Sequence, residues 1–117
     1  MADVSDSGQH GGHDYKSAVI NDGSSGDNTI IALVSSKKLK IFAVLLVADG
    51  TVNVRFESNA GGTAITGVMN LEAREGFTLA VSPPAFLFET TAGQLLNLEL
   101  SAAVTVNGFV SYWDDDD

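Results

Sequence analysis

The chain has 117 residues, which suits one domain, and a formal net charge of −9 at pH 7. It contains no cysteine, which excludes disulfides, thiolate metal sites and a catalytic thiol. The acidity lies at the ends: residues 1–27 carry five Asp against one Lys, and residues 114–117 are four Asp. The body, 28–113, has six acidic and five basic residues. Because binding to a phosphate backbone needs clustered Lys and Arg, this balance argues against a nucleic-acid partner.

Neither a targeting segment nor a membrane span is expected. The first fifteen residues are polar and acidic, without the basic and apolar regions of a signal peptide. The most apolar run, 39–48, has ten residues and contains a lysine, whereas a membrane helix needs roughly 20 apolar residues. We therefore expect a protein that is made in a cytoplasm and does not bind membranes.

Residues 1–28 are expected to form a flexible acidic arm rich in Gly and Ser. Residues 1–16 are nearly free of aliphatic side chains and cannot bury enough apolar surface to offset the entropy of the chain. Residues 17–21 (SAVIN) are a short apolar interruption, either an edge strand or an anchor. Residues 22–28 (DGSSGDN) have the composition of a hinge.

From residue 29 onward, short runs of Val, Ile, Thr, Phe and Leu alternate with Gly, Asn and Pro, a pattern that predicts strands. The expected strands are 29–34, 38–48, 51–58, 63–71, 77–81, 85–90, 95–100 and 104–113. Asp49-Gly50 predicts a hairpin turn between the second and third of them. About eight strands without a convincing helix predict a single antiparallel β-sandwich of jelly-roll type over 29–113, followed by an acidic tail, 114–117.

The strand at 38–48 predicts a subunit interface, because its later part is apolar on both faces and such a strand must be covered on both. The alternative is that loops of the same chain, or the arm, cover it. Small domains often gain stability by oligomerising, so we expect a homo-oligomer, with a trimer preferred by analogy. The predicted interface comprises Phe42, Val44, Leu46, Phe86, Leu87 and Phe88.

No catalytic residue, cofactor or metal site is predicted. His10 and His13 are the only histidines. With Asp14 they could hold a transition metal, but a solvated Gly-rich tail is the simpler interpretation. A Ser-His-Asp arrangement cannot form in a body without histidine. No pair stands out among the body carboxylates Asp49, Glu57, Glu72, Glu75, Glu89 and Glu99.

The remaining charge clusters also have simple interpretations. Asp114 to Asp117 could attract Ca²⁺, but four adjacent carboxylates without a shaped loop make a poor site, and a solubilising tail is preferred. Lys37, Lys38 and Lys40 are the only basic cluster. They either protect a strand start from edge-to-edge aggregation or meet an acidic partner. We therefore predict that the chain is not an enzyme.

The stretch 28–112 resembles a group of small proteins encoded in tailed-bacteriophage genomes. The resemblance is carried by KKLKI at 37–41, ADGTV at 48–52, ITGVM at 65–69, a Pro-containing segment, and FETTAGQLLNLELSAA at 88–103. The last run is similar to the group's "FET-AG–LNL-LS" pattern and is the most specific part of the match. The arm and the Asp-rich end fall outside the resemblance.

The resemblance implies a jelly-roll protein of the virion, commonly trimeric, that serves as a capsid decoration (cement) protein or in tail-associated fibres. The implied partners are the major capsid protein and other copies of the chain, and the implied location is the capsid surface after synthesis in the host cytoplasm. We predict that the arm binds the shell or a neighbouring subunit as an added strand, through Tyr15, Val19 and Ile20.

The alternative function is a tail-associated receptor- or carbohydrate-binding module. Such a module exposes aromatic side chains over a shallow site. Trp113, Tyr112 and Tyr15 are the only Trp and Tyr residues, and all lie near the ends of the chain. This position is mild evidence against stacking on a sugar.

Overall fold

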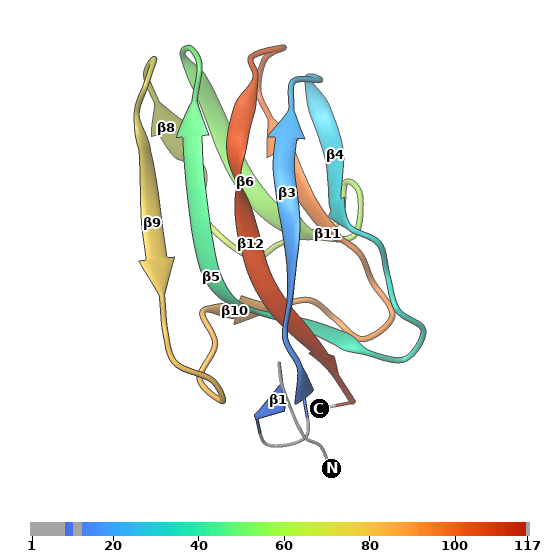
Figure 1. Ribbon diagram of the computed structural model, residues 1–117. Helices are drawn as coiled ribbons and strands as arrows, with labels where there is room; N and C mark the ends of the chain where they lie inside the picture. Colours follow the sequence, from blue (N-terminus) through green and yellow to red (C-terminus); the bar gives the residue numbers. More distant parts are fainter. Residues whose placement is uncertain (1–8, 11–12, 117) are drawn as a thin grey trace.

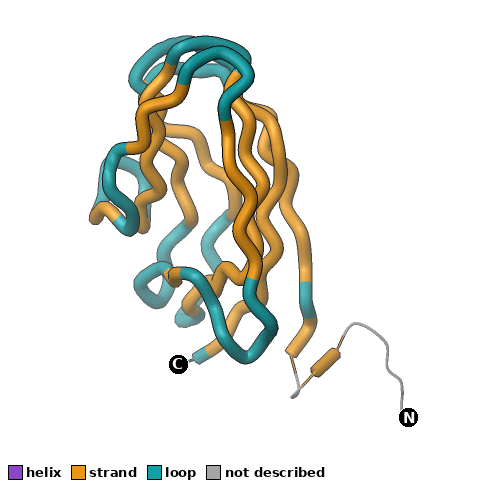
Figure 2. The backbone as a smooth tube through the Cα atoms, turned by 90° about the vertical axis from the view of Figure 1, so that its left-hand side faces the viewer, coloured by secondary structure: helices purple, strands orange, loops and turns teal. Residues whose placement is uncertain are grey.

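The computed structural model describes residues 9–10 and 13–116, and all regular structure in these ranges is β-strand. β1 (Gln9–His10) and β2 (His13–Asp14) pair with each other. The other strands form two five-stranded antiparallel sheets that pack face to face (Figures 1 and 2). The predicted all-β sandwich is thereby confirmed. The described residues include no helix long and apolar enough to cross a membrane.

The first sheet lies in front in Figure 1. β3 (Lys16–Asp22) is one edge strand, β12 (Val106–Asp115) lies beside it, and β5 (Lys38–Ala48) follows. The far edge of β5 is shared by β9 (Gly76–Ala80) and β10 (Phe88–Glu89), which pair with different parts of it. We call this the front sheet.

The second sheet lies behind it and is built in the same way. β4 (Gly26–Ile31) is an edge strand, with β11 (Leu96–Leu100) and β6 (Val52–Ser58) beside it. The outer edge of β6 is shared by β7 (Thr63–Ala64) and β8 (Met69–Leu71). The two sheets therefore hold ten strands where about eight were predicted, because β3 lies in the segment that was predicted as an arm and the strand predicted over 63–71 is divided into β7 and β8. We call this the back sheet.

The core fills the space between the sheets, and regular alternation in the sequence places it there. β6 and β11 each turn every second side chain inward, and these side chains are at most 2% exposed. Burying each such aliphatic or aromatic side chain contributes roughly 1.5–3 kcal/mol. The inward residues of these two strands are Val52, Val54, Phe56, Leu96, Leu98 and Leu100.

β5 changes which face it presents part-way along, because Phe42 is an extra residue in its pairing with β12. Ser111 pairs with Ala43 and Tyr112 with Ile41, so Phe42 has no opposite residue. Such a bulge shifts the alternation by one position. Leu39 and Ile41 face the core before it, and Val44, Leu46 and Ala48 face the core after it. After the bulge the strand is apolar on both faces, as its sequence indicates, because Ala43, Leu45 and Val47 then face outward.

The turn at Asp49-Gly50 does not close a hairpin, contrary to the prediction. β5 belongs to the front sheet and β6 to the back sheet, so the turn carries the chain across the core. The backbone N–H of Asp49 donates to the carbonyl of Thr105, 2.9 Å away, in the loop before β12. β5 and β6 each have an apolar face, and these faces bury more surface when they pack against each other across the core than when the two strands pair side by side in one sheet.

The domain begins well before residue 29, so the boundary predicted for the arm is wrong. β3 pairs with β12 from Lys16 to Asp22, and Ile20 is 1% exposed in the core. β4 begins at Gly26, and β12 continues to Asp115 rather than ending at 113. Because the sequence around β3 is polar and rich in Gly, its composition does not indicate that Ile20 is a core residue in an edge strand. Residues 1–8, 11–12 and 117 of the predicted arm and tail lie outside the described residues.

Gly108 is required where β12 lies close against the backbone of β5. Its φ is 150°, and a Cβ added there would lie 1.8 Å from the carbonyl oxygen of Leu45. Only glycine allows this approach.

Candidate interaction surface

The outward face of the front sheet presents three rows of side chains that are fixed by the strand register. The middle row runs Val19, Phe109, Leu45 and Thr78 across β3, β12, β5 and β9. The row on one side is Ser17, Ser111, Ala43 and Ala80, and the row on the other is Asn21, Asn107, Val47 and Gly76. We refer to these three rows as the β12 face.

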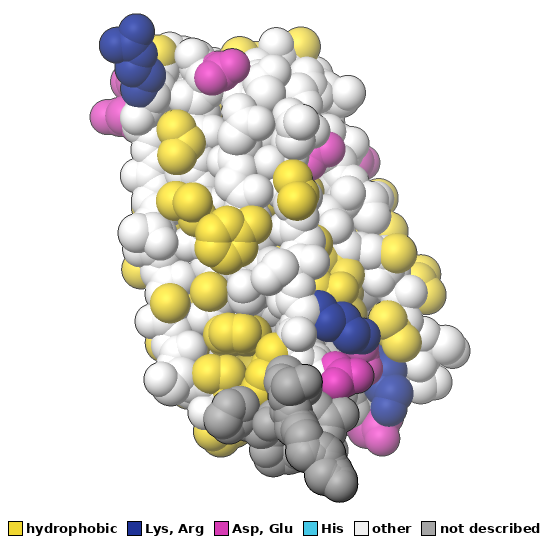
Figure 3. All heavy atoms as spheres, in the orientation of Figure 1, with side chains coloured by type: hydrophobic (Ala, Val, Ile, Leu, Met, Phe, Trp, Pro, Cys, Tyr) yellow, Lys and Arg dark blue, Asp and Glu magenta, His cyan; other side chains and the backbone are white. Residues whose placement is uncertain are grey.

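The β12 face is apolar at its centre and carries no charge. Val19 is 76% exposed, Val47 40% and Phe109 39%, and Leu45 is half-buried between them. None of the twelve residues in the rows is charged. In Figure 3 the hydrophobic side chains gather along the middle of this face, while Lys, Arg, Asp and Glu lie at its margins. Exposed apolar side chains on an uncharged face, with charged groups at its margin, are typical of a protein-binding surface.

The polar residues of the β12 face are small and partly satisfied within the sheet. The hydroxyls of Ser17 and Ser111 lie 3.1 Å apart, within hydrogen-bond distance. Next to this row, Lys16 donates to Asp114 at a distance of 3.0 Å. This hydrogen bond raises the pKa of Lys16. The ion pair thus ties the start of β3 to the end of β12 at the margin of the face.

An aromatic cluster lies at the end of the front sheet where β12 finishes. Trp113 is at its centre, with ring centroids 5.7 Å from Tyr15, 5.8 Å from Phe42 and 6.3 Å from Phe86. The ammonium group of Lys40 lies 4.3 Å from the centroid of Phe86. Trp113 is only 2% exposed. The only tryptophan is therefore not available as a stacking platform for a sugar.

The six predicted interface residues do not form one surface. Val44 and Leu46 are core residues, 1% and 0% exposed, because the bulge turns them inward. Leu87 and Phe88, with Val44, line an apolar hollow of about 190 Å³ at the open edge between the sheets. The prediction of one interface made of these residues is therefore wrong.

The other two predicted interface residues, Phe42 and Phe86, both touch Trp113 in the aromatic cluster. Phe42 is half-buried, and Phe86 remains 40% exposed. The ammonium group over the Phe86 ring comes from the same chain. These two residues therefore lie together, but apart from the other four.

The three predicted arm contacts also separate. Ile20 is buried in the core, and Tyr15 packs edge-on against Phe42 and Trp113. Of the three, only Val19 projects from the sheet, at the centre of the β12 face. A strand cannot use both faces for a partner once one face is in the core, so this segment can offer Val19 but not Ile20.

The basic cluster and the acidic end of the chain pair with groups of the same chain. Lys37 lies 2.7 Å from Asp116, and this hydrogen bond raises the pKa of Lys37. Lys40 lies 2.7 Å and Lys38 3.7 Å from Glu89. The metal site considered for His10 and His13 involves side chains that lie outside what the structure describes.

The sequence-based reasoning missed Leu45, Val47 and Phe109 as surface residues. Leu45 and Val47 were not among the predicted interface residues, because the alternation of the strand was extended from Leu39 without a bulge, which selected Phe42, Val44 and Leu46 instead. Phe109 lies next to Gly108, and its outward direction follows once Val106 and Val110 are placed in the core. The available signal was the alternation of Val106, Gly108 and Val110 with Asn107 and Phe109 in β12, which places Phe109 on the face opposite to the two core valines.

Comparisons with known proteins add little to this geometry. No family model matches the chain. No curated protein matches it either. Among solved structures, it is similar to the cryo-EM structure of a virus-like particle of the giant freshwater prawn Macrobrachium rosenbergii extra small virus, with 20% identity and a TM-score of 0.40 over 100% of this chain and 88% of that chain. It is also similar to the crystal structure of PirA, with 12% identity and a TM-score of 0.28 over 86% of this chain and 92% of that one. Both TM-scores are too low to establish a shared fold.

Proposed function

We propose that the chain is a non-enzymatic structural protein of a virion. It assembles with copies of itself and binds the outside of an icosahedral phage capsid as a decoration (cement) protein, after synthesis in the host cytoplasm. The observation that carries the proposal is the β12 face, an exposed and uncharged apolar surface on a rigid sheet. The resemblance to phage-encoded virion proteins in the run 88–103 supports it.

The occupant of the β12 face is a second copy of the same chain. A chain with a net charge of −9 repels its own copies wherever acidic groups face each other. The β12 face is uncharged, so two copies approach there with the least repulsion and the most apolar burial. Three copies that each turn this face toward a common threefold axis form a closed homo-oligomer, and a trimer is proposed. The surfaces left outside the ring face the major capsid protein.

The proposal includes a sandwich of jelly-roll type, and the strand order supports it. β3 and β4 lie in different sheets, as do β5 and β6, and β11 and β12. Each sheet thus interleaves strands from the two ends of the chain with strands from its middle, as two Greek keys wound together would do. The split strands β7/β8 and β9/β10 then occupy the last position in each sheet.

The test is the copy number of the protein in purified virions, measured by quantitative mass spectrometry against the major capsid protein. We expect a copy number of the same order as that of the shell protein. The double variant Val19→Glu/Phe109→Glu places two charges on the β12 face and should reduce incorporation at least tenfold. The matched control is Leu33→Glu, which adds a charge at an exposed apolar residue (52% exposed) outside the β12 face and should form the same oligomer as the wild type.

A copy number of only a few to a few dozen would contradict decoration and place the protein on the tail, where a receptor- or carbohydrate-binding role becomes the better proposal. Equal incorporation of the double variant and the control would show that the β12 face is not used. Circular dichroism of the purified variants should show the wild-type β spectrum, because the substituted side chains point to solvent.

A further inference from the structure

β3 (Lys16–Asp22) is an edge strand of the front sheet, and one side of its backbone is open. It pairs with β12 along all seven residues without a bulge. Among the described strands, none pairs with its other side, which faces away from the rest of the front sheet in Figure 1. β3 is also the longest of the edge strands in the two sheets. It therefore presents a row of backbone N–H and C=O groups with which another strand can pair.

The middle of β3 lacks the features that keep an edge strand from pairing. Native proteins protect such edges with charged side chains, Pro, bulges or a covering loop. Residues 17–21 (SAVIN) contain no charge and no Pro. Val19, at their centre, is 76% exposed. A regular, exposed edge of this kind is suited to the addition of a strand from a second chain.

The charges of β3 lie only at its two ends, and they determine which partner fits. Lys16 is the first residue of the strand and Asp22 the last. If two copies of β3 pair antiparallel and centred on Val19, Lys16 of each copy lies opposite Asp22 of the other. Opposite residues of an antiparallel pair project from the same face of the sheet, so these two side chains can meet. Parallel pairing would instead place like charges side by side, and an antiparallel pair shifted by two residues would leave both charges unmatched.

Both charged groups are available to a second copy. Asp22 takes part in no ion pair within the part of the chain that the structure describes. The Nζ of Lys16 lies 3.0 Å from Oδ2 of Asp114, but an ammonium group has three donors and can bind a second carboxylate as well. The side chain of Lys16 is 46% exposed. Two ion pairs can therefore form between copies without breaking one within a copy.

The uncharged residues of β3 also match in this register. Ser17 lies opposite Asn21 of the second copy, so two polar side chains meet on the outward face. Ala18 lies opposite Ile20 of the second copy on the inward face, where a small side chain meets a large one. Val19 lies opposite its own counterpart and continues the apolar middle row of the β12 face from one copy into the next. Every opposite pair along the strand is therefore compatible.

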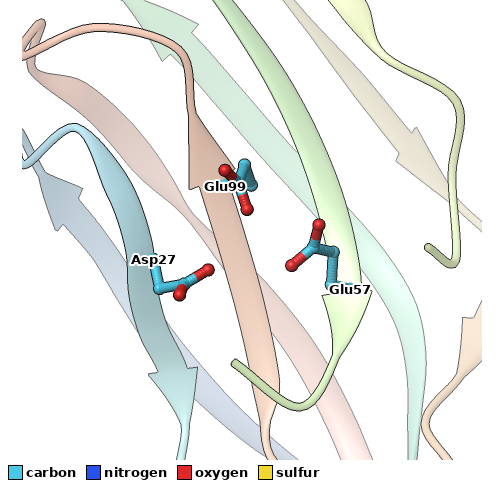
Figure 4. A group of neighbouring side chains, drawn as sticks. All are labelled: Asp27, Glu57 and Glu99. Atoms are coloured by element: carbon cyan, nitrogen blue, oxygen red, sulfur yellow. The ribbon is translucent and has the colours of Figure 1, made fainter. Parts of the chain in front are cut away.

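The neighbouring edge strand of the back sheet, β4, is less suited to a second copy. It contributes Asp27, which points toward Glu57 and Glu99 in Figure 4. One oxygen of each of these carboxylates lies within 4.8 Å of the others. One guanidinium, that of Arg55, binds Glu57. Two copies that met along β4 would bring two such acidic groups together, whereas two copies that meet along β3 place opposite charges face to face.

We propose that two copies of the chain pair through β3, antiparallel and centred on Val19, so that their front sheets form one continuous sheet across a twofold axis. Twofold dimers are the commonest homo-oligomers. About six to eight backbone hydrogen bonds cross a pair of this length, while exposed ion pairs contribute little and mainly select the register. The edge lies in the plane of the sheet, whereas the β12 face points out of it. The contact is thus distinct from the one proposed for that face, and it needs only a second copy and no capsid.

The test is an exchange of charges in full-length chains that all carry Phe109→Glu, which blocks the centre of the β12 face and leaves β3 unchanged. We expect this parent chain to form dimers in sedimentation velocity at about 20 mM NaCl, where charges are weakly screened. Asp22→Lys places two lysines opposite each other at both ends of the contact, and Lys16→Asp places two aspartates there. Each should raise the Kd of the dimer about tenfold, because like charges directly opposite are unfavourable. An equimolar mixture of the two variants should recover the dimer, because every Lys then faces an Asp.

The matched control is Asp49→Lys, which makes the same change of charge at an exposed residue in the turn after β5, two strands from the open edge, and should dimerise as the parent does. Circular dichroism should show the same β spectrum for all variants. A parent chain that stays monomeric at about 100 µM would overturn the proposal, since that concentration is well above the Kd expected of a stable dimer. So would a mixture of Asp22→Lys and Lys16→Asp that associates no more than either variant alone. Neither result changes the copy number in virions, which tests the proposed function separately.

Discussion

Glu57 is the residue whose burial most needs an explanation. It is 0% exposed and charged, and burial of a carboxylate is unfavourable unless it is paired and hydrogen-bonded. Arg55 binds one of its oxygens and Asn97 the other. Both partners come from adjacent positions on the same sheet face, so the backbone register holds them in place. Glu99 and Asp27 also place carboxylate oxygens within 4.8 Å of those of Glu57. Burial, and then repulsion by Glu57 and Asp27, raise the pKa of Glu99.

This arrangement predicts a stability effect of Glu99 that depends on pH. The folded pKa of Glu99 is raised above the ordinary value of 4.5, so the folded state binds its proton more tightly than the unfolded state. Its contribution is most favourable below that value and is lost as the pH rises through the folded pKa. Glu99→Gln should therefore be more stable than the wild type at pH 7 and lose this advantage toward pH 4, as measured by urea unfolding. A variant that is less stable at pH 7, or a difference independent of pH, would contradict this account, and Asp49→Asn serves as the control.

At the scale of elements, β3 has two faces with opposite roles. Ile20 faces the core, while Val19 faces outward and is 76% exposed. Their neighbours in sequence are polar or small, so the segment has the composition of a linker. β3 also pairs with β12 along seven residues and thereby covers its backbone edge. A composition-based boundary cannot detect this, because hydrogen bonding to β12 involves the backbone and leaves no trace in the side chains.

Truncation tests this assignment. Deleting residues 2–13 removes no residue of β3 and should leave a cooperative unfolding transition, followed by the fluorescence of Trp113. Deleting residues 2–22 removes β3, exposes the edge of β12 and should cause aggregation or loss of the transition. Ile20→Ala should cost about 2–5 kcal/mol, whereas the control Val19→Ala should stay within about 0.5 kcal/mol. A stable, cooperatively folding chain without residues 2–22 would restore the view that this segment is an independent arm.

The elements that the sequence predicted well are those with strict alternation. Residues 51–58 and 95–100 alternate cleanly, and the structure gives β6 and β11 at nearly the same bounds. Residues 63–71 contain Gly67 and became two short strands, because no continuous apolar face holds them against β6. The bulge in β5 could not be predicted from its own sequence. It depends on how Phe42 meets the end of β12, which is a long-range contact.

At the scale of the molecule, the sequence predicted the sandwich but not which strands share a sheet. Asp49-Gly50 has the local chemistry of a hairpin, yet the apolar faces on both sides of it are better buried against each other across the core. The grouping of three carboxylates on the back sheet could not be predicted from the sequence for the same reason. Asp27, Glu57 and Glu99 lie far apart in sequence and meet only through the pairing of β11 with β4 and β6. The strand order and register of the two sheets therefore determine the positions of both the apolar β12 face and the group of three carboxylates.

The separation of charge from the β12 face predicts how self-association responds to salt. Two chains of net charge −9 repel each other, and the apolar contact contains no ion pair to be screened. At about 1 M ionic strength the screening length falls to roughly 3 Å, from about 30 Å at 0.01 M. The Kd for self-association, measured by sedimentation velocity, should therefore fall several-fold between 20 mM and 500 mM NaCl. Val19→Glu/Phe109→Glu should remain monomeric at both concentrations, because added salt does not restore the apolar contact. If salt instead weakens the association of the wild-type chain, ion pairs such as those of Lys37 with Asp116 are exchanged between copies, and the interface lies at the charged margin of the sheet.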